Sequence, residues 1–280
     1  MVRAPAAVRV PDGFVQVSSA GSSDPFLQVP SAGSIARVDA SPGLESDIRD
    51  KSETGGEPRL IVAVDGPSGA GKSSASRGAA IALGLRYLDT GSMYRALTWW
   101  LLERGADISD AALVGGLAAE PVIEVGTDPH APWTQVNGTD VSAAIRTREV
   151  TSAVSAVAAV PRVRAHLIAQ QRDIIANAPG IVAEGRDIGT VVAPDAGVKV
   201  YLTADSTARA DRRAAETSWS AASTQVDQDR RDRLDAGQSA KADDAVEIDS
   251  TRLDLDQVID IIVRLARERT GVPYPRQQTR

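Results

Sequence analysis

The segment Gly66-Pro67-Ser68-Gly69-Ala70-Gly71-Lys72-Ser73 decides the fold of this 280-residue chain. It fits the pattern G-x-x-x-x-G-K-[ST], in which backbone N–H groups of a glycine-rich turn converge on a phosphate. The apolar run Leu60–Val64 precedes it, and a stretch of small residues from Ser73 to Leu83 follows. Because the positive end of the following helix then faces the bound anion, the order strand, loop, helix supports the motif. The segment predicts a nucleoside triphosphate site with Lys72 as its cation.

The composition excludes several classes of protein. Hydrophobic residues make up 42% of the chain, which suffices for a packed core. A net charge of −6 disfavours a general nucleic-acid binder, which needs a basic surface. The chain has no cysteine, which excludes disulfides and thiol catalysis, and its two histidines, His130 and His166, lie far apart. No apolar run approaches the roughly 20 residues of a membrane span. We therefore expect a cytoplasmic monomer without nucleic-acid or membrane partners.

Residues 1–58 differ from the rest of the chain. They are rich in Ser, Gly, Pro and Ala and show no sustained hydrophobic period. Such a composition buries too little apolar surface to offset the entropy of ordering. We predict a disordered N-terminal arm, or upstream sequence translated from an early start. Two short β-like runs, Val8–Val10 and Phe14–Val17, leave a small partner-binding element as the alternative.

Deletion of residues 1–57 is expected to leave both the melting temperature and the turnover number nearly unchanged, because the first convincing strand begins at Leu60. The measurement is thermal unfolding and steady-state kinetics of the truncated and full-length proteins. A large loss in either quantity would show that the arm packs on the domain.

From Leu60 onward, strand and helix patterns alternate, which predicts a parallel sheet with helices on both faces. The expected strands are Leu60–Val64, Arg86–Asp89, Gly180–Ala183, Val198–Leu202 and Ala245–Ile248. The expected helices are Lys72–Leu83, Met93–Arg104, Ser142–Ala159, Pro161–Ala178, Ser206–Thr217 and Leu255–Thr270, with Asp205 as an N-cap and Gly271 as a helix stop.

Two segments break this alternation. Between Pro121 and Val141, alternating runs flank Asn137-Gly138, a strong signal for a β-hairpin, so a small antiparallel insert is expected. The stretch from Ser218 to Ala242 is polar and rich in arginine and aspartate. We interpret it as a charged lid.

Charged and polar residues follow the predicted strands on the side of the sheet where ligands collect. Thr90 and Arg95 come after the second strand, and Glu184-Gly185-Arg186-Asp187 ends the next one. More arginines follow at Arg209, Arg212 and Arg231. Arginines above a phosphate loop favour phosphoryl transfer between two anionic ligands.

Five motifs in order resemble those of bacterial cytidylate kinases (CMP kinases), a family of nucleoside monophosphate kinases. They are Asp65–Ser74, Leu88–Arg95, Ile145–Val150, Val160–Arg164 and Glu184–Val192. The resemblance covers about three quarters of the chain, from Leu60 to about Thr270.

The resemblance implies a P-loop NTPase fold with a five-stranded parallel sheet, and transfer of phosphoryl from ATP to CMP or dCMP with Mg²⁺. It places the kinase domain at residues 59–272, with a monophosphate-binding insert at about 90–160, a lid at about 216–242, and a tail at 273–280. Two alternatives stay open. One is a kinase for another small acceptor, and the other is a nucleotide-binding regulatory protein that has lost transfer.

The resemblance also implies roles for individual residues. Catalysis would rest on Lys72, Arg186, Arg231 and Asp235. The ATP phosphates would lie against Gly66, Pro67, Ser68, Gly69, Ala70, Gly71, Lys72, Ser73, Ser74, Arg209 and Arg212, with Ser73 reaching Mg²⁺. The acceptor would contact Thr90, Arg95, Ser155, Arg164, Arg186, Asp187 and Asp235, and the Asp187 carboxylate would accept from the cytosine amino group.

One position departs from the family pattern. Gln238 stands where a phosphate-binding arginine is expected, and the lid is about four residues short. Glutamine supplies neither the charge nor the forked donor geometry of arginine. Lys241 or Arg233 could take its place.

Overall fold

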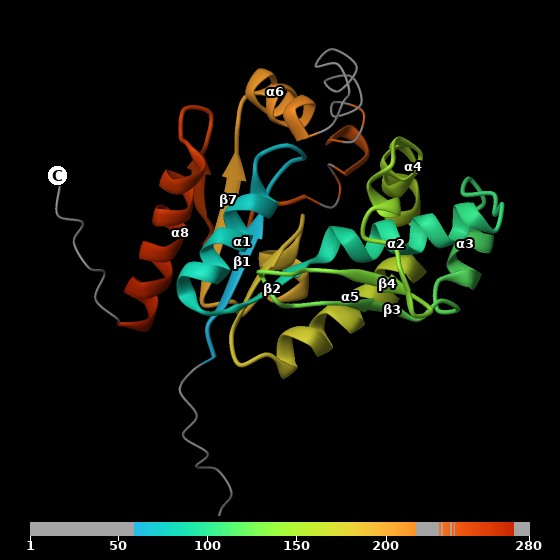
Figure 1. Cartoon of the computed structure of the whole chain (residues 1–280), viewed down its shortest axis with the longest axis horizontal. Helices are drawn as coiled ribbons and strands as arrows, with labels where there is room; N and C mark the ends of the chain where they lie inside the picture. Colours follow the sequence, from blue (N-terminus) through green and yellow to red (C-terminus); the bar gives the residue numbers. More distant parts are fainter. Residues whose placement is uncertain (1–58, 217–229, 231, 236, 238, 272–280) are drawn as a thin grey trace, which may run out of the picture. The chain divides into compact units, whose positions relative to one another are not determined.

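A five-stranded parallel sheet forms the centre of the protein. The computed structural model describes residues 59–216, 230, 232–235, 237 and 239–271 (Figure 1). The strand order is β2-β6-β1-β7-β8, and every neighbouring pair is parallel. The strands are β1 (Ile61–Asp65), β2 (Arg86–Asp89), β6 (Ile181–Glu184), β7 (Val198–Thr203) and β8 (Val246–Asp249).

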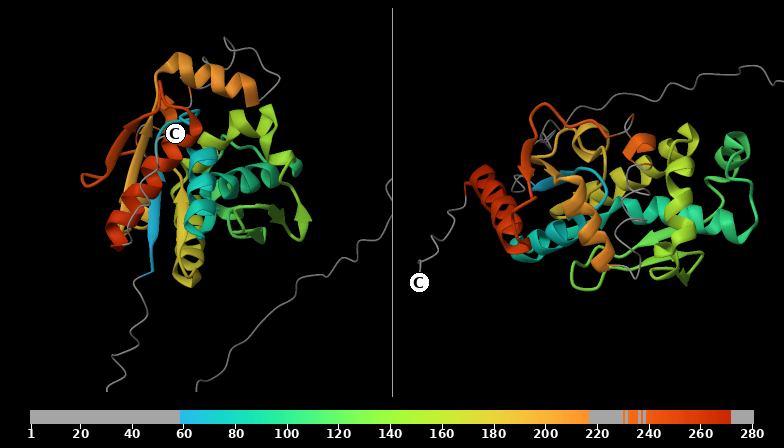
Figure 2. Two further views of the ribbon diagram at one scale, coloured as in Figure 1. Left: turned by 60° about the vertical axis from the view of Figure 1, so that its left-hand side comes forward. Right: turned by 90° about the horizontal axis from the view of Figure 1, so that it is seen from above.

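Helices cover both faces of this sheet, as the alternating pattern predicts (Figures 1 and 2). Residues 62 and 64 of β1 face a core shared with helices α1 and α8, whereas Ala63 faces a second core that contains residues of α2 and α5. The larger helices are α1 (Lys72–Leu83), α2 (Thr90–Glu103), α4 (Arg148–Ala158), α5 (Pro161–Asn177), α6 (Ser206–Glu216) and α8 (Leu255–Thr270). The predicted α/β fold of P-loop kinases, with its five-stranded parallel sheet, is confirmed.

The sheet topology fixes the place of the phosphate loop. Strand β1 lies between β6 and β7, and the loop leaves its carboxyl end. Strands β2 and β6 end at the same edge, because Asp89 lies opposite Glu184 in their register. Loops that are far apart in the sequence therefore meet at the carboxyl edge of the sheet.

The predicted insert forms a separate antiparallel sheet with the order β3-β4-β5 (Ile123–Val125, Thr134–Val136 and Thr139–Asp140). The turn between β4 and β5 is the Asn137-Gly138 pair, with φ values of 50° and 77°. Positive φ at both positions is the requirement of the tight hairpin turn that this dipeptide signals. The hairpin prediction is confirmed.

Three features differ from the expected elements. The stretch Ser142–Ala159 is not one helix, because Thr147 is extended and separates a 3₁₀ turn (Ala144–Arg146) from α4. The Thr147 hydroxyl instead accepts from the N–H of Val150 and caps α4. A short helix, α3 (Ala111–Leu117), and a π-helical turn at Ile188–Val192 were not expected.

Several sequence-based predictions lie outside the described residues. These are the arm, the tail, most of the lid, and the side chains of Arg231 and Gln238. The domain boundaries therefore stay predictions. Within the part of the chain that the structure describes, no helix is both long and apolar enough to cross a bilayer.

Candidate active site

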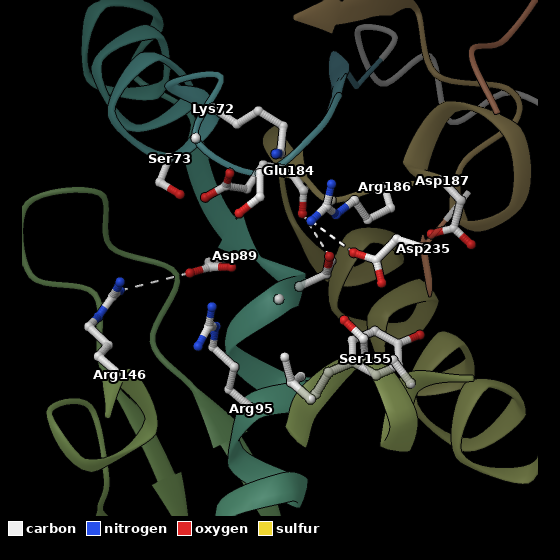
Figure 3. Close-up of a pocket in the computed structure, with 18 of the residues that line it drawn as sticks. Lys72, Ser73, Asp89, Arg95, Arg146, Ser155, Glu184, Arg186, Asp187 and Asp235 are labelled. Carbon is white, nitrogen blue, oxygen red and sulfur yellow. Dashed lines mark hydrogen bonds and ion pairs between the residues drawn. The ribbon is translucent and has the colours of Figure 1, made fainter. Parts of the chain in front are cut away.

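A cavity opens at the carboxyl edge of the sheet, above β1, β2 and β6 (Figure 3). Segments far apart in the sequence supply its lining: the phosphate loop, the start of α2, the 3₁₀ turn before α4, helices α4 and α5, the loop after β6, and Asp235 of the lid. Of the predicted site residues it brings together Ser68, Gly69, Gly71, Lys72, Ser73, Ser74, Thr90, Arg95, Ser155, Arg164, Arg186, Asp187 and Asp235.

The phosphate loop has the backbone that its glycines predict. Gly66, Gly69 and Gly71 all have positive φ, at 146°, 77° and 89°. Gly71 is the N-cap of α1, so the amino end of that helix opens into the cavity. The Lys72 ammonium group donates to the Pro67 carbonyl at 2.8 Å and lies at the mouth of the loop.

The loop after β6 carries an interlocked set of charges. The Arg164 guanidinium pairs with the Asp187 carboxylate. Arg186 donates to the Gly66 carbonyl at 3.2 Å and pairs with Asp235 at 2.9 Å. Both arginine side chains are about one-fifth exposed, so these pairs are only partly screened by solvent. The lid aspartate thus lies against the arginine of the β6 loop.

Arg209 and Arg212 lie beside the phosphate loop, outside the residues that line the cavity. Arg209 donates to the Ser68 carbonyl at 3.1 Å and pairs with Asp232 at 2.5 Å. Arg212 donates to the Ser250 hydroxyl at 2.9 Å and to its carbonyl. Both guanidinium groups therefore stand next to the loop that would hold a triphosphate.

Lys241 and Arg233, the two candidates to replace the lid arginine that is missing at position 238, both lie outside the cavity. Lys241 pairs with Glu247 at 2.8 Å on the surface, and this partner raises the pKa of the lysine. Arg233 is exposed. Neither residue lines the cavity.

Three of the residues predicted to bind the nucleoside monophosphate line the wall opposite the phosphate loop. The Ser155 hydroxyl is buried and makes no hydrogen bond within the described part of the chain, although it faces the cavity. Arg95 donates to the Thr151 hydroxyl at 2.9 Å. The Thr90 hydroxyl donates to the Glu184 carbonyl at 2.7 Å and so ties α2 to β6. A buried hydroxyl without a partner is costly, which indicates that Ser155 is completed by a ligand.

Sequence reasoning left two carboxylates of the cavity without a role. Asp89 ends β2 and Glu184 ends β6, so the register places them side by side. Glu184 is buried and accepts from the Tyr87 hydroxyl at 2.5 Å. Burial, and then the nearby Asp89, raise the pKa of Glu184 to about 7. The available signal was that both residues end a β-strand at the edge where ligands collect.

Glu184→Gln is expected to stabilise the nucleotide-free and metal-free protein at alkaline pH but not in acid. The folded-state pKa is raised above the usual 4.5, so the wild-type protein loses stability as the pH rises from 4.5 to about 7. The gain of the variant should therefore be near zero at about pH 5 and on the order of 3 kcal/mol at about pH 8. Urea unfolding at both pH values measures it, with exposed Glu124→Gln as the control. A gain that does not depend on pH would contradict the account.

The oxygen atoms of Ser73, Glu184 and Asp89 are suitable ligands for Mg²⁺. The Ser73 hydroxyl, which also hydrogen-bonds to Glu184, lies in the cavity with the Glu184 and Asp89 carboxylates. Mg²⁺ prefers such oxygens and usually takes only one or two protein ligands together with substrate phosphates. Among the described residues there is no cluster of three or more His, Cys, Asp or Glu side chains that would hold a metal ion without a phosphate.

A sequence profile described as cytidylate kinase matches residues 62–268. The chain belongs to the cytidylate kinase family. The match spans the central sheet, the antiparallel insert and α8 up to Glu268, so the cavity lies wholly within the cytidylate kinase region.

Curated cytidylate kinases align with most of the chain. One from Streptomyces avermitilis is 52% identical over 218 residues, which is 76% of this chain and 94% of the relative. One from Streptomyces griseus subsp. griseus is 55% identical over 212 residues, or 74% and 92%. Among solved structures, a gluconokinase from Sinorhizobium meliloti 1021 has a TM-score of 0.43 at 14% identity, covering 77% of this chain and 95% of that one.

Proposed function

We propose that the chain transfers the terminal phosphoryl group of ATP to CMP or dCMP, giving ADP and CDP or dCDP. The observation that carries this proposal is a cavity in which the phosphate loop, the Arg164–Asp187 pair and the Ser155 hydroxyl lie together. One end of the cavity suits a triphosphate, and the other offers hydrogen-bonding groups to a base.

On the donor side, the loop N–H groups and the Lys72 ammonium group bind the ATP phosphates. Lys72 stabilises the charge that develops on the transferring group, and Arg209 and Arg212 add cations beside the loop. Ser73, with Glu184 and Asp89 behind it, would hold Mg²⁺, and this ion would supply positive charge that neutralises the phosphate groups during transfer. No covalent intermediate is needed, because catalysis consists of positioning and electrostatic stabilisation.

On the acceptor side, Arg95 and Arg186 bind the monophosphate, and Asp235 contacts the sugar hydroxyls. Asp187 accepts from the N4 amino group of cytosine, with Ser155 and Arg164 beside it. The Arg164 guanidinium pairs with the Asp187 carboxylate and holds it in place, and a carboxylate can only accept hydrogen bonds. A carboxylate therefore prefers the cytosine amino group over the carbonyl oxygen that uracil presents at the same place.

An ADP-release assay with CMP, dCMP, UMP and AMP as acceptors tests the proposal. We expect CMP and dCMP to give the highest kcat/KM. A clear preference for AMP or UMP would favour a kinase of another acceptor. Absence of ADP release with every acceptor, in a protein that binds ATP, would favour the regulatory alternative.

Asp187→Asn is expected to shrink the CMP-over-UMP preference in kcat/KM by roughly tenfold or more, because an amide can turn to donate to uracil. The ratio of the two kcat/KM values is the proper measure, since it does not depend on the fraction of active protein. Exposed Asp243→Asn is the control. An unchanged ratio in Asp187→Asn would assign base choice to Ser155 and Arg164 instead.

The cytoplasmic location, the monomeric state and the absence of nucleic-acid partners stay predictions from the sequence.

A further inference from the structure

Asp65, the last residue of β1, is a buried carboxylate to which the proposed reaction gives no role. It lies at the carboxyl end of this central strand, and the residue is only 4% exposed. One oxygen accepts from the N–H of Ile188 and the other from the N–H of Gly189, each at 2.8 Å. Both donors belong to the segment that follows the Arg186-Asp187 pair.

Three consecutive residues at the end of β1 hold this segment. The Val64 carbonyl accepts from the N–H of Gly185 at 3.1 Å, and the Gly66 carbonyl accepts from the Arg186 guanidinium. The Asp65 carboxylate holds the far side, immediately after Asp187. The residues on both sides of Asp187 are therefore hydrogen-bonded to the end of β1, the strand that leads into the phosphate loop.

A carboxylate is the side chain that this geometry requires. Two neighbouring N–H groups converge, and both need an acceptor inside the protein. Asparagine supplies one acceptor and turns an N–H donor toward the other N–H, and alanine supplies none. Burial raises the pKa of Asp65, whereas the two N–H bonds and the Lys72 charge oppose that shift. Burying a carboxylate is costly, and here the two backbone hydrogen bonds offset part of that cost.

We propose that Asp65 is a positioning residue for the acceptor base. It fixes the segment behind Asp187, and so sets where the Asp187 carboxylate meets the exocyclic group of a pyrimidine. The end of β1 leads into the phosphate loop and also holds the segment that carries Asp187. It therefore fixes the position of Asp187 relative to the phosphate loop. This inference rests on the proposed function and adds to it a determinant of base choice that does not touch the substrate.

Asp65→Asn, which keeps the size of the side chain, tests the proposal through the ratio of kcat/KM for CMP to that for UMP. We expect the ratio to fall by roughly fivefold or more, because a displacement of about 1 Å in a positioning contact can cost up to about 100-fold. Two other effects cancel in the ratio. Partial unfolding lowers both values equally, and any change in the field at Lys72 acts on transfer to both acceptors.

Two comparisons make the test specific. Ile262→Val in α8 removes a buried methyl group far from the acceptor wall and is expected to lower stability while the ratio stays at the wild-type value. In the second comparison, Asp65→Asn is added to Asp187→Asn. If Asp65 acts through Asp187, it should change the ratio little in that background, so the two effects will not multiply.

An unchanged ratio in Asp65→Asn, or effects of the two substitutions that multiply fully, would overturn the proposal. If Asp65→Asn gives too little folded protein, Asp65→Glu serves, because it keeps the charge but moves the oxygens by one methylene. The same fall in the ratio is expected from it, and no fall would count against the proposal. The CMP-to-UMP ratio of the wild-type protein tests the proposed function itself. Absence of a CMP preference there would contradict the proposed function rather than the role of Asp65.

Discussion

Lys72→Ala is expected to lower kcat by roughly 100-fold or more while the protein stays folded. The Lys72 ammonium group stands at the mouth of the phosphate loop, held by the Pro67 carbonyl at 2.8 Å. In the proposed function this group would meet the β- and γ-phosphate oxygens and would stabilise their charge most strongly in the transition state. The hydrogen bond to Pro67 lies at the surface of the cavity, so its loss should cost little stability. Steady-state kinetics with saturating ATP and CMP, together with thermal unfolding, measure the two effects separately.

Two further variants sharpen this experiment. Lys72→Arg keeps the charge but not the compact ammonium geometry, and should recover only part of the activity. Arg264→Ala removes an exposed cation from α8, at a distance from the cavity, and should leave kcat unchanged. Activity of Lys72→Ala close to that of the wild type would contradict the catalytic role of the phosphate loop.

Gly66→Ala is expected to lower the stability of the fold by about 3 kcal/mol or more, which corresponds to a fall of about 10 °C in Tm. Gly66 has a φ of +146°, a conformation that residues with a side chain rarely adopt. A Cβ atom at this position would lie 2.1 Å from the Leu202 carbonyl oxygen. Because that oxygen belongs to β7, which pairs with β1 on one side and β8 on the other, it cannot move aside without cost. The Gly66 carbonyl also accepts from Arg186, so activity should fall as well.

Gly84→Ala is the matched control for this substitution. Gly84 also has positive φ, at 67°, but an added Cβ would meet nothing within 4 Å. Only the backbone preference is then lost, which costs about 1–2 kcal/mol. Urea unfolding of the two variants should show a clearly larger loss for Gly66→Ala. Equal losses would show that the contact with β7 does not constrain the phosphate loop.

Local signals in the sequence were sufficient for most of the fold. All five parallel strands were predicted to within one residue at each end. For β1, β6 and β7 the signal was a run of buried, mostly β-branched residues with glycine, proline or aspartate nearby. The Asn137-Gly138 turn and the Asp205 cap rest on backbone preferences that hold in any fold. The phosphate loop was also predictable from local sequence, because its glycines and the helix that follows are contiguous in the chain.

Features that depend on tertiary contacts were not predictable in this way. The extended Thr147 follows from a hydroxyl cap at the start of α4, which competes with a continuous helix through the same residues. Asp65 and Glu184 owe their surroundings to residues that are far away in the sequence, since Asp65 accepts from Ile188 across 123 residues and Glu184 accepts from Tyr87 across 97. Lys241 was a reasonable substitute by charge, but only the structure shows its pairing with Glu247 on the surface.

The most direct test of the central claim is to count both products of one reaction. The protein is incubated with ATP, Mg²⁺ and CMP, and the ADP and CDP formed are separated and quantified over the same interval. Phosphoryl transfer predicts one CDP for each ADP, with neither product formed when CMP is omitted. ADP without an equal amount of CDP would show transfer to water or to another acceptor, and would contradict the account.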